Sequence, residues 1–156
     1  MHAAVASVSQ MVLEAADAVC VVDTDATVEQ FLRVATIRAD SILVVVEPYF
    51  TSLETGRRMT RLGKLQGYEH IALVANKVRS EQESETVYEF ATEHGLEVAG
   101  IVPHDLRMPD AEWAQSAPLD FDPDSPSIAA IDELGRRLLE RCDQTRAVAD
   151  GQASSA

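Results

Sequence analysis

The sequence predicts an α/β fold: a parallel β-sheet with helices on both faces. Three apolar runs, residues 18–23, 41–46 and 71–75, are short enough for buried strands, and each ends in polar residues. Such runs, separated by helix-length segments, are typical of parallel sheets that bind ligands at the carboxyl edge. A fourth run, residues 97–102, follows another helix-length segment. We therefore expect four parallel strands joined by right-handed crossovers.

The first part of the chain is expected to be helix, strand, helix. Residues 1–16 place Val5, Val8 and Val12 on one helical face, and residues 28–37 are expected to form a short helix. No strand with a glycine-rich turn comes before the first helix. We therefore expect a sheet that is incomplete at its amino terminus.

Two capping boxes predict where the central helices begin. Thr51 and Glu54 have the spacing of the first box, for a helix that ends at Gly67. Ser80 and Glu83 form the second, for a helix ending at Gly95.

The last third of the chain is expected to be a short helix, a loop and a long helix. The short helix covers residues 110–115, and the proline- and aspartate-rich loop covers residues 117–126. Ser125 and Pro126 suit the N-cap and first turn of the long helix. Residues 146–156 are small and polar, so we expect a disordered tail after a single domain, residues 1–145.

Composition excludes several classes of function. The 156 residues include 26 acidic and 13 basic ones, a net charge of −13, which disfavours binding to nucleic acid and to anionic membranes. Cys20 and Cys142 lack metal-site spacing, so we expect no structural metal. No apolar run is long enough for a transmembrane helix, and no signal segment is recognisable. The expected location is the cytoplasm.

Polar residues that follow the strands are the candidate ligand contacts. Asp23 ends the first strand, where a carboxylate can reach Mg²⁺ or its water shell, although an N-cap or turn role is also open. Asn76 offers a donor and an acceptor to a purine edge, and the Lys77 stem can lie along a base or ribose; the alternative is a strand-end turn. A guanine-reading motif has Asp two residues after the lysine. Arg79 stands there, which favours adenine.

The fourth strand runs into Pro103, His104 and Asp105. A histidine beside an aspartate suggests acid–base catalysis, but no nucleophile motif accompanies the pair, so a structural loop wall is favoured. Glu47 follows the second strand in a similar turn and is free to cap a helix or line a cleft. The chain contains no G-x-x-x-x-G-K-[ST] motif, the usual phosphate-binding loop.

Taken together, the strand-end motifs resemble those of the CooC-type ATPases, members of the MinD/ParA (SIMIBI) class of P-loop proteins that serve nickel insertion into carbon monoxide dehydrogenase. The resemblance covers about residues 2–140, and the matching segments are residues 21–29, 43–48, 52–55, 73–78 and 100–105. It implies that ATP or ADP with Mg²⁺ is the cofactor. It also implies a homodimer, or a partner ATPase or client metalloprotein.

The same resemblance assigns roles to residues. Asp23 would be the catalytic, Mg²⁺-associated acid of the switch region. The residues around the adenine base would be Asn76, Lys77, Pro103, His104 and Asp105.

The chain also departs from the family. The P-loop and a metal-binding Cys-x-Cys pair are absent, and Thr27 replaces a switch glycine whose backbone approaches the γ-phosphate. Without these groups phosphoryl transfer loses most of its electrostatic stabilisation, so we expect no hydrolysis by this chain alone. Two hypotheses remain: a portion of an ATP-binding protein, and a non-catalytic interaction module built on the same fold. A receiver-type phosphoacceptor fits poorly, because the acidic residues cluster on one strand only.

Overall fold

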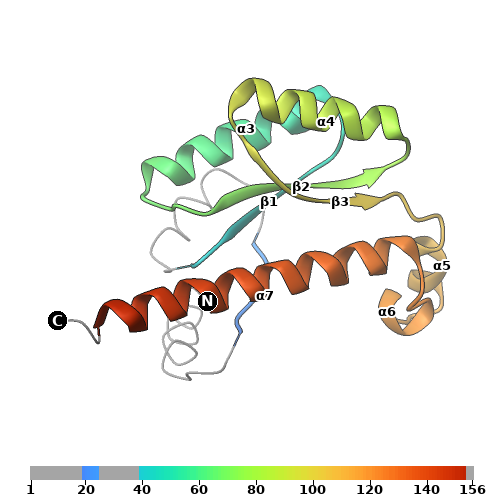
Figure 1. Cartoon of the computed structure of the whole chain (residues 1–156). Coiled ribbons are helices and arrows are strands. Elements are labelled where there is room, and N and C mark those ends of the chain that lie inside the picture. The colour runs from blue at the N-terminus through green and yellow to red at the C-terminus, as the bar shows by residue number, and fades with distance from the viewer. Residues whose placement is uncertain (1–18, 25–38, 154–156) are drawn as a thin grey trace.

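The computed structural model describes residues 19–24 and 39–153, with side chains up to residue 142. The labels are those of Figure 1. The strands are β1 (Ile42–Val46), β2 (Ile71–Val78) and β3 (Glu97–Pro103). The helices are α3 (Phe50–Leu65), α4 (Glu81–His94), α5 (Met108–Trp113), α6 (Pro118–Phe121) and α7 (Pro126–Ala153).

The sheet is parallel, as the sequence predicts. Within the described residues it has three strands in the order β1-β2-β3, with Val44 opposite Leu73 and Leu73 opposite Val98. Helices α3 and α4 cover one face and α7 the other (Figure 1). The predicted α/β class with helices on both faces is therefore confirmed.

The strand predicted at residues 18–23 is not found in the described part of that segment. Residues 19–24 have no strand structure, and Val21 is 90% exposed. An apolar run is stable as a strand only when neighbouring backbone groups pair with it and other side chains cover it, and the described residues supply neither. The helices expected at residues 1–16 and 28–37 lie outside the described residues.

The core lies between the sheet and the pair α3 and α4. Its fully buried side chains include Leu53, Leu73 and Val87, one each from α3, β2 and α4. Helix α3 approaches the sheet closely at Gly56, where an added Cβ would lie 2.6 Å from Val46 Cγ1. A glycine is therefore what permits this helix–sheet distance.

The serine cap of one predicted capping box is confirmed, although the Glu83 carboxylate accepts from the Arg79 N–H and not from that of Ser80, and the other box is wrong. Ser80 Oγ accepts a hydrogen bond from the Glu83 N–H at 3.2 Å and caps α4, and Gly95 is the C-cap of this helix with φ +62°. The box at Thr51 and Glu54 lies inside α3, which begins at Phe50 without a side-chain cap. The helix starts earlier because the Tyr49 carbonyl already accepts from the Leu53 N–H at 3.1 Å, which places Thr51 inside the first turn. The Glu54 carboxylate accepts hydrogen bonds from Arg57.

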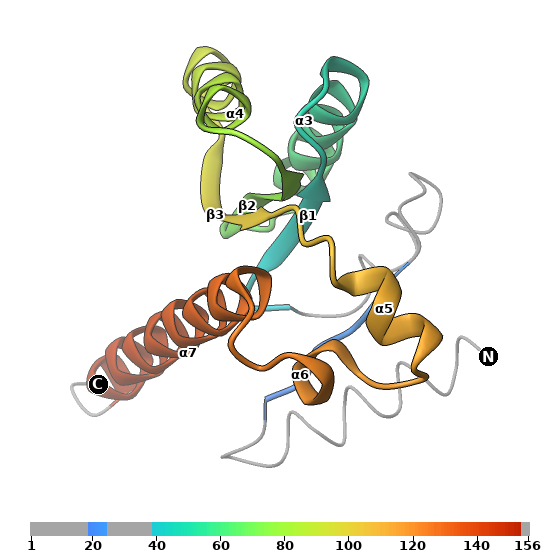
Figure 2. The same ribbon diagram turned by 90° about the vertical axis from the view of Figure 1, so that its right-hand side faces the viewer.

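The carboxyl-terminal third agrees with the prediction in outline. Helix α5 begins two residues before the expected position, and the single turn α6 occupies part of the expected loop, because Pro118 suits a first helical turn. Helix α7 begins at Pro126 as predicted. It continues to Ala153 where a disordered tail was expected from residue 146, since alanines in this segment favour helix. Figure 2 shows α5 and α6 beside the amino end of α7.

Candidate functional site

The carboxyl edge of the sheet brings together most of the residues that the sequence singles out. Glu47 follows β1, Asn76 and Lys77 lie near the carboxyl end of β2, and His104 follows β3. Lys77 Nζ lies 3.0 Å from Glu47 Oε1, and the His104 N–H donates to the Val78 carbonyl at 2.8 Å. Glu47 and Lys77 are 30 residues apart in sequence, and Val78 and His104 are 26 apart, yet all lie at one edge of the sheet. Helices α5 and α6 lie beyond this edge (Figures 1 and 2).

The backbone at Lys77 is unusual. Its φ is +58°, a left-handed conformation that costs free energy for any residue except glycine, and the β2–β3 register is irregular between Ala75 and Val78. Residues held in such conformations cluster at ligand-binding sites. The bulge turns the end of β2 out of the regular strand pattern and presents two consecutive polar side chains, Asn76 and Lys77, at the edge.

Asn76 is oriented by its own neighbour. Its Oδ1 accepts a hydrogen bond from the Lys77 N–H at 2.9 Å. Within the described part of the chain, the Nδ2 group makes no hydrogen bond. Because an amide Nδ2 carries two protons, Asn76 presents a fixed donor at the edge.

Lys77 and Glu47 link the ends of β2 and β1. The pair is partly exposed, so its contribution to stability is at most about 1 kcal/mol. The Glu47 backbone is fixed more firmly, because its N–H donates to Ser52 Oγ in the first turn of α3 at 2.9 Å. Glu47 thus holds Lys77 by a contact that a ligand is able to displace.

Asp105 is engaged on both carboxylate oxygens. Oδ1 accepts from the Arg107 N–H at 2.8 Å, and Oδ2 accepts from Ser127 Oγ at 2.7 Å. The Arg107 N–H first, and then the Ser127 hydroxyl, lower the pKa of Asp105 below its ordinary value. The group is therefore ionised at neutral pH and is not a proton donor.

Sequence reasoning missed the partners of Asp105. The sequence does show that Ser125 and Ser127 place two hydroxyl groups at the start of a predicted helix, where they can form hydrogen bonds. Nothing in the sequence indicates that this helix start meets a loop 22 residues earlier.

The loop after β3 is also held by Arg107. Its Nη1 pairs with Asp122 Oδ2 at 3.2 Å, and its guanidinium lies over the Phe121 ring, 5.2 Å from the centroid. These contacts tie α6 to the exit of β3. The Arg107 guanidinium is therefore already engaged by side chains of this protein.

Asp23 lies in the described segment 19–24 and is exposed. The structure records no hydrogen bond or ion pair between it and the carboxyl-edge residues. Across residues 19–24 and 39–153, no group of three or more His, Cys, Asp or Glu side chains is arranged to hold a metal ion. The role of Asp23 toward Mg²⁺ stays a prediction.

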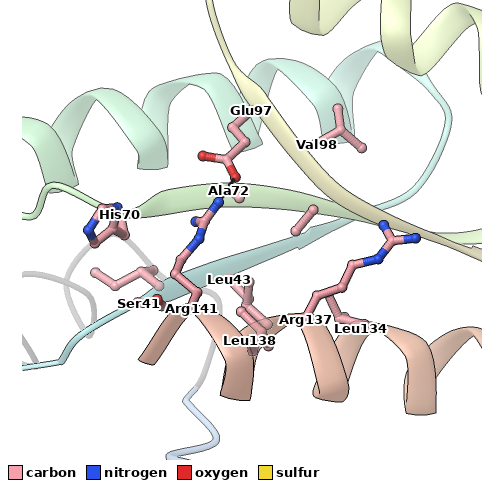
Figure 3. A pocket seen from close by; sticks show the side chains of 12 residues that line it. Ser41, Leu43, His70, Ala72, Glu97, Val98, Leu134, Arg137, Leu138 and Arg141 are labelled. Carbon is pink, nitrogen blue, oxygen red and sulfur yellow. Dashed lines mark hydrogen bonds and ion pairs between the residues drawn. The ribbon is translucent and has the colours of Figure 1, made fainter. Parts of the chain in front are cut away.

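A concave region lies at the opposite, amino edge of the sheet. It has a volume of about 200 Å³ and lies between the strands and α7 (Figure 3). Arg141 Nη2 pairs with Glu97 Oε1 at 2.6 Å across it, and Arg137 on its rim pairs with Glu133. It contains none of the predicted site residues, so the candidate site remains at the carboxyl edge.

Within the described segments no helix is both long and apolar enough to cross a membrane. No family model matches the chain.

The fold is that of MinD-type proteins. The MinD cell division protein of Aquifex aeolicus superposes with a TM-score of 0.61 at 22% identity, over 73% of this chain and 49% of that one. A chain of the MinC:MinD cell division protein complex of the same organism superposes with a TM-score of 0.57 at 24% identity, over 65% of this chain and 43% of that one.

Sequence relatives define the relationship further. The uncharacterized ATP-binding protein MJ0823 of Methanocaldococcus jannaschii is 34% identical over 124 residues, which are 80% of this chain and 47% of that protein. The carbon monoxide dehydrogenase accessory protein CooC of Rhodospirillum rubrum is 27% identical over 147 residues, 94% of this chain and 54% of CooC. The chain is thus related to a portion of the CooC/MinD-type ATPases of the SIMIBI class, as predicted. It spans about half the length of these relatives.

Proposed function

We propose that this chain supplies the base-recognition half of a MinD/ParA-class ATP-binding protein. In this proposal Asn76 and Lys77 contact the adenine of ATP or ADP, and Pro103 with His104 covers the base. The observation that carries the proposal is the meeting of the ends of β2 and β3, where the His104 N–H donates to the Val78 carbonyl at 2.8 Å. The names of the ATP-binding relatives support the choice of ligand.

The chemistry of the edge suits an adenine ring. The free Asn76 Nδ2 donates to a ring nitrogen, and the Lys77 stem offers an aliphatic surface to the base or ribose. Mg²⁺ would accompany the phosphates, and Asp23 is the proposed acid near its water shell. Because the 156 residues contain no P-loop, the groups that stabilise the transferring phosphoryl are not among them, and hydrolysis by this chain alone is not proposed.

The exposed side of β1 supports association with further structure. Among the described strands β1 pairs only with β2, and its Val45 side chain is 63% exposed. An unpaired apolar edge is a surface on which another strand adds. We propose a cytoplasmic homodimer, or a complex with a partner ATPase or a client metalloprotein. The resemblance to CooC suggests nickel insertion as the biological role.

A non-catalytic interaction module is the alternative. It is favoured by one observation: Lys77 already pairs with Glu47, and Asp105 already has two partners, so much of the charge at the edge is satisfied without nucleotide. A protein of this kind would keep its fold and be indifferent to nucleotide and Mg²⁺.

Binding of a fluorescent ATP analogue with Mg²⁺ separates the two proposals. It should be measured for the chain alone and for the chain fused behind the amino-terminal portion of the archaeal ATP-binding relative, which by the resemblance carries the P-loop. We expect binding by the fusion and little by the chain alone.

Asn76→Ala should weaken binding by the fusion about tenfold, the effect of losing one hydrogen bond of about 1.4 kcal/mol. Gln82→Ala removes an exposed amide from α4 and serves as the control. A fusion that binds the analogue equally well with Ala at position 76 would show that the base lies elsewhere. A fusion that folds and does not bind would favour the interaction module.

A further inference from the structure

We propose that Asp105 is a positioning residue: it anchors the exit of β3 to the amino end of α7 through Ser127, and it acts on a ligand only through His104. The ligand in question rests on the proposed function. The anchoring itself rests on the geometry of four described residues.

The first step is the direction of the hydrogen bonds. An ionised carboxylate only accepts, so the single hydroxyl proton of Ser127 points at Asp105 Oδ2, 2.7 Å away. The 3.0 Å contact between the two serine hydroxyls then requires Ser125 to donate to Ser127. Ser125 Oγ in turn accepts from the Ile128 N–H at 3.3 Å. The four groups thus form one chain of donors that ends on the carboxylate.

The second step is burial. Ser125 and Ser127 are each 3% exposed, so neither hydroxyl exchanges its partner freely for water. Hydrogen bonds that run in one direction strengthen one another in such surroundings, and removing one member leaves the next unsatisfied. The amino end of α7 also carries a partial positive charge, which favours a carboxylate at this point.

The third step connects this anchor to the candidate site. His104 precedes Asp105 and donates its N–H to the Val78 carbonyl at the end of β2. The loop after β3 is therefore fixed on one side to β2 and on the other to α7. The Arg107 N–H donates to Oδ1 of the same carboxylate and so closes a local turn from Asp105 to Arg107. A direct contact between Asp105 and a ligand would require one oxygen to give up its present partner.

The test compares Ser127→Ala with Asp105→Asn. Ser127→Ala leaves the carboxylate in place and removes only its anchor, so it separates positioning from direct contact. Ser80→Ala is the control, because it removes a hydrogen-bonded serine hydroxyl from the amino end of a different helix, α4. The structural readout is the hydrogen-exchange rate of the His104 amide in the chain as it stands. The Leu96 amide, which donates to the Ala91 carbonyl, is the internal reference.

We expect Ser127→Ala and Asp105→Asn each to speed exchange at His104 about tenfold relative to Leu96, which corresponds to about 1.4 kcal/mol. Ser80→Ala should leave this ratio unchanged. In the nucleotide-binding fusion, both site variants should weaken binding of the ATP analogue by similar factors.

Two results overturn the proposal. One is an unchanged His104 ratio in both site variants. The other is loss of nucleotide binding in Asp105→Asn with none in Ser127→Ala, which would make Asp105 a direct ligand. If the unaltered fusion does not bind nucleotide, the proposed function fails, and the exchange ratio still decides the role of Asp105.

Discussion

At the scale of single residues, Gly56 sets the distance between α3 and the sheet. A Cβ at this position would lie 2.6 Å from Val46 Cγ1 and 3.2 Å from Leu73 Cδ2. Both neighbours belong to the core and have little room to move, so any larger residue forces the helix and the strands apart.

The first prediction is that Gly56→Ala lowers the free energy of unfolding by about 1–3 kcal/mol, the usual cost of overpacking. Gly135→Ala in α7 is the control, because its added Cβ meets nothing within 4 Å. That variant should be neutral or more stable by up to about 1 kcal/mol, since alanine favours helix. Urea unfolding measures both, and equal effects of the two variants would refute the account of Gly56.

Thr60 places a polar atom in the core, and burying such an atom without a hydrogen bond lowers stability. Its side chain is 2% exposed, and among the described residues Oγ1 has no hydrogen-bond partner. Thr60→Val replaces the hydroxyl by a methyl of similar shape, so we expect the free energy of unfolding to rise by about 1 kcal/mol. Urea unfolding checks this as well. A loss of stability would mean that the hydroxyl is bonded after all.

At the scale of single elements, α3 carries a cluster of charged side chains that makes the stability of the protein depend on pH. Arg57 binds both oxygens of Glu54 at 2.7 Å, and Arg58 adds a contact at 3.1 Å. The hydrogen bonds from Arg57 are the largest cause that lowers the pKa of Glu54 to about 2.

A carboxylate whose pKa is lowered by folding stabilises the protein above its unfolded pKa. That stability is lost as pH falls through the folded pKa. We therefore predict that the melting temperature falls as pH is lowered from about 5 to about 2, and that Glu54→Gln flattens this profile. Thermal unfolding at several pH values measures it, with the exposed Glu89→Gln on α4 as control. A profile as steep in Glu54→Gln as in the unaltered protein would contradict the prediction.

The elements also show what a sequence reveals and what it does not. Strand β2 was predictable from its long apolar run, and helix α4 from Ser80 at its amino end and Gly95 at its carboxyl end, because these signals are local in the sequence. The predicted cap at Thr51 was wrong because the helix already starts at Phe50, with the Tyr49 carbonyl accepting from the Leu53 N–H, and the spacing of Thr51 and Glu54 does not reveal this. For the candidate site, strand ends identified Asn76 and His104, whereas the bond from Ser127 to Asp105 depends on tertiary packing.

At the scale of the whole molecule, the described sheet has an open side at β1. Val45 points away from the core formed with α3 and is 63% exposed, while α7 packs on β3. An unpaired strand edge is where association with another chain is expected.

We predict that Val45→Lys reduces concentration-dependent self-association of the chain, because a lysine on an edge strand disfavours pairing with another chain. Val19→Lys changes an equally apolar, exposed residue outside the sheet and is the control. Sedimentation at several concentrations measures the effect. Equal reduction by both variants would point to general hydrophobicity and away from the edge of β1.

The central claim is that nucleotide is recognised at the carboxyl edge of the sheet. The most direct measurement is a titration of the isotopically labelled fusion with MgATP, followed by the amide signals of the chain. The account predicts shifts concentrated at Asn76, Lys77 and His104, with little change at His70 and Glu97 beside the amino-edge depression. Shifts concentrated at the amino edge, or none at saturating ATP, would contradict it.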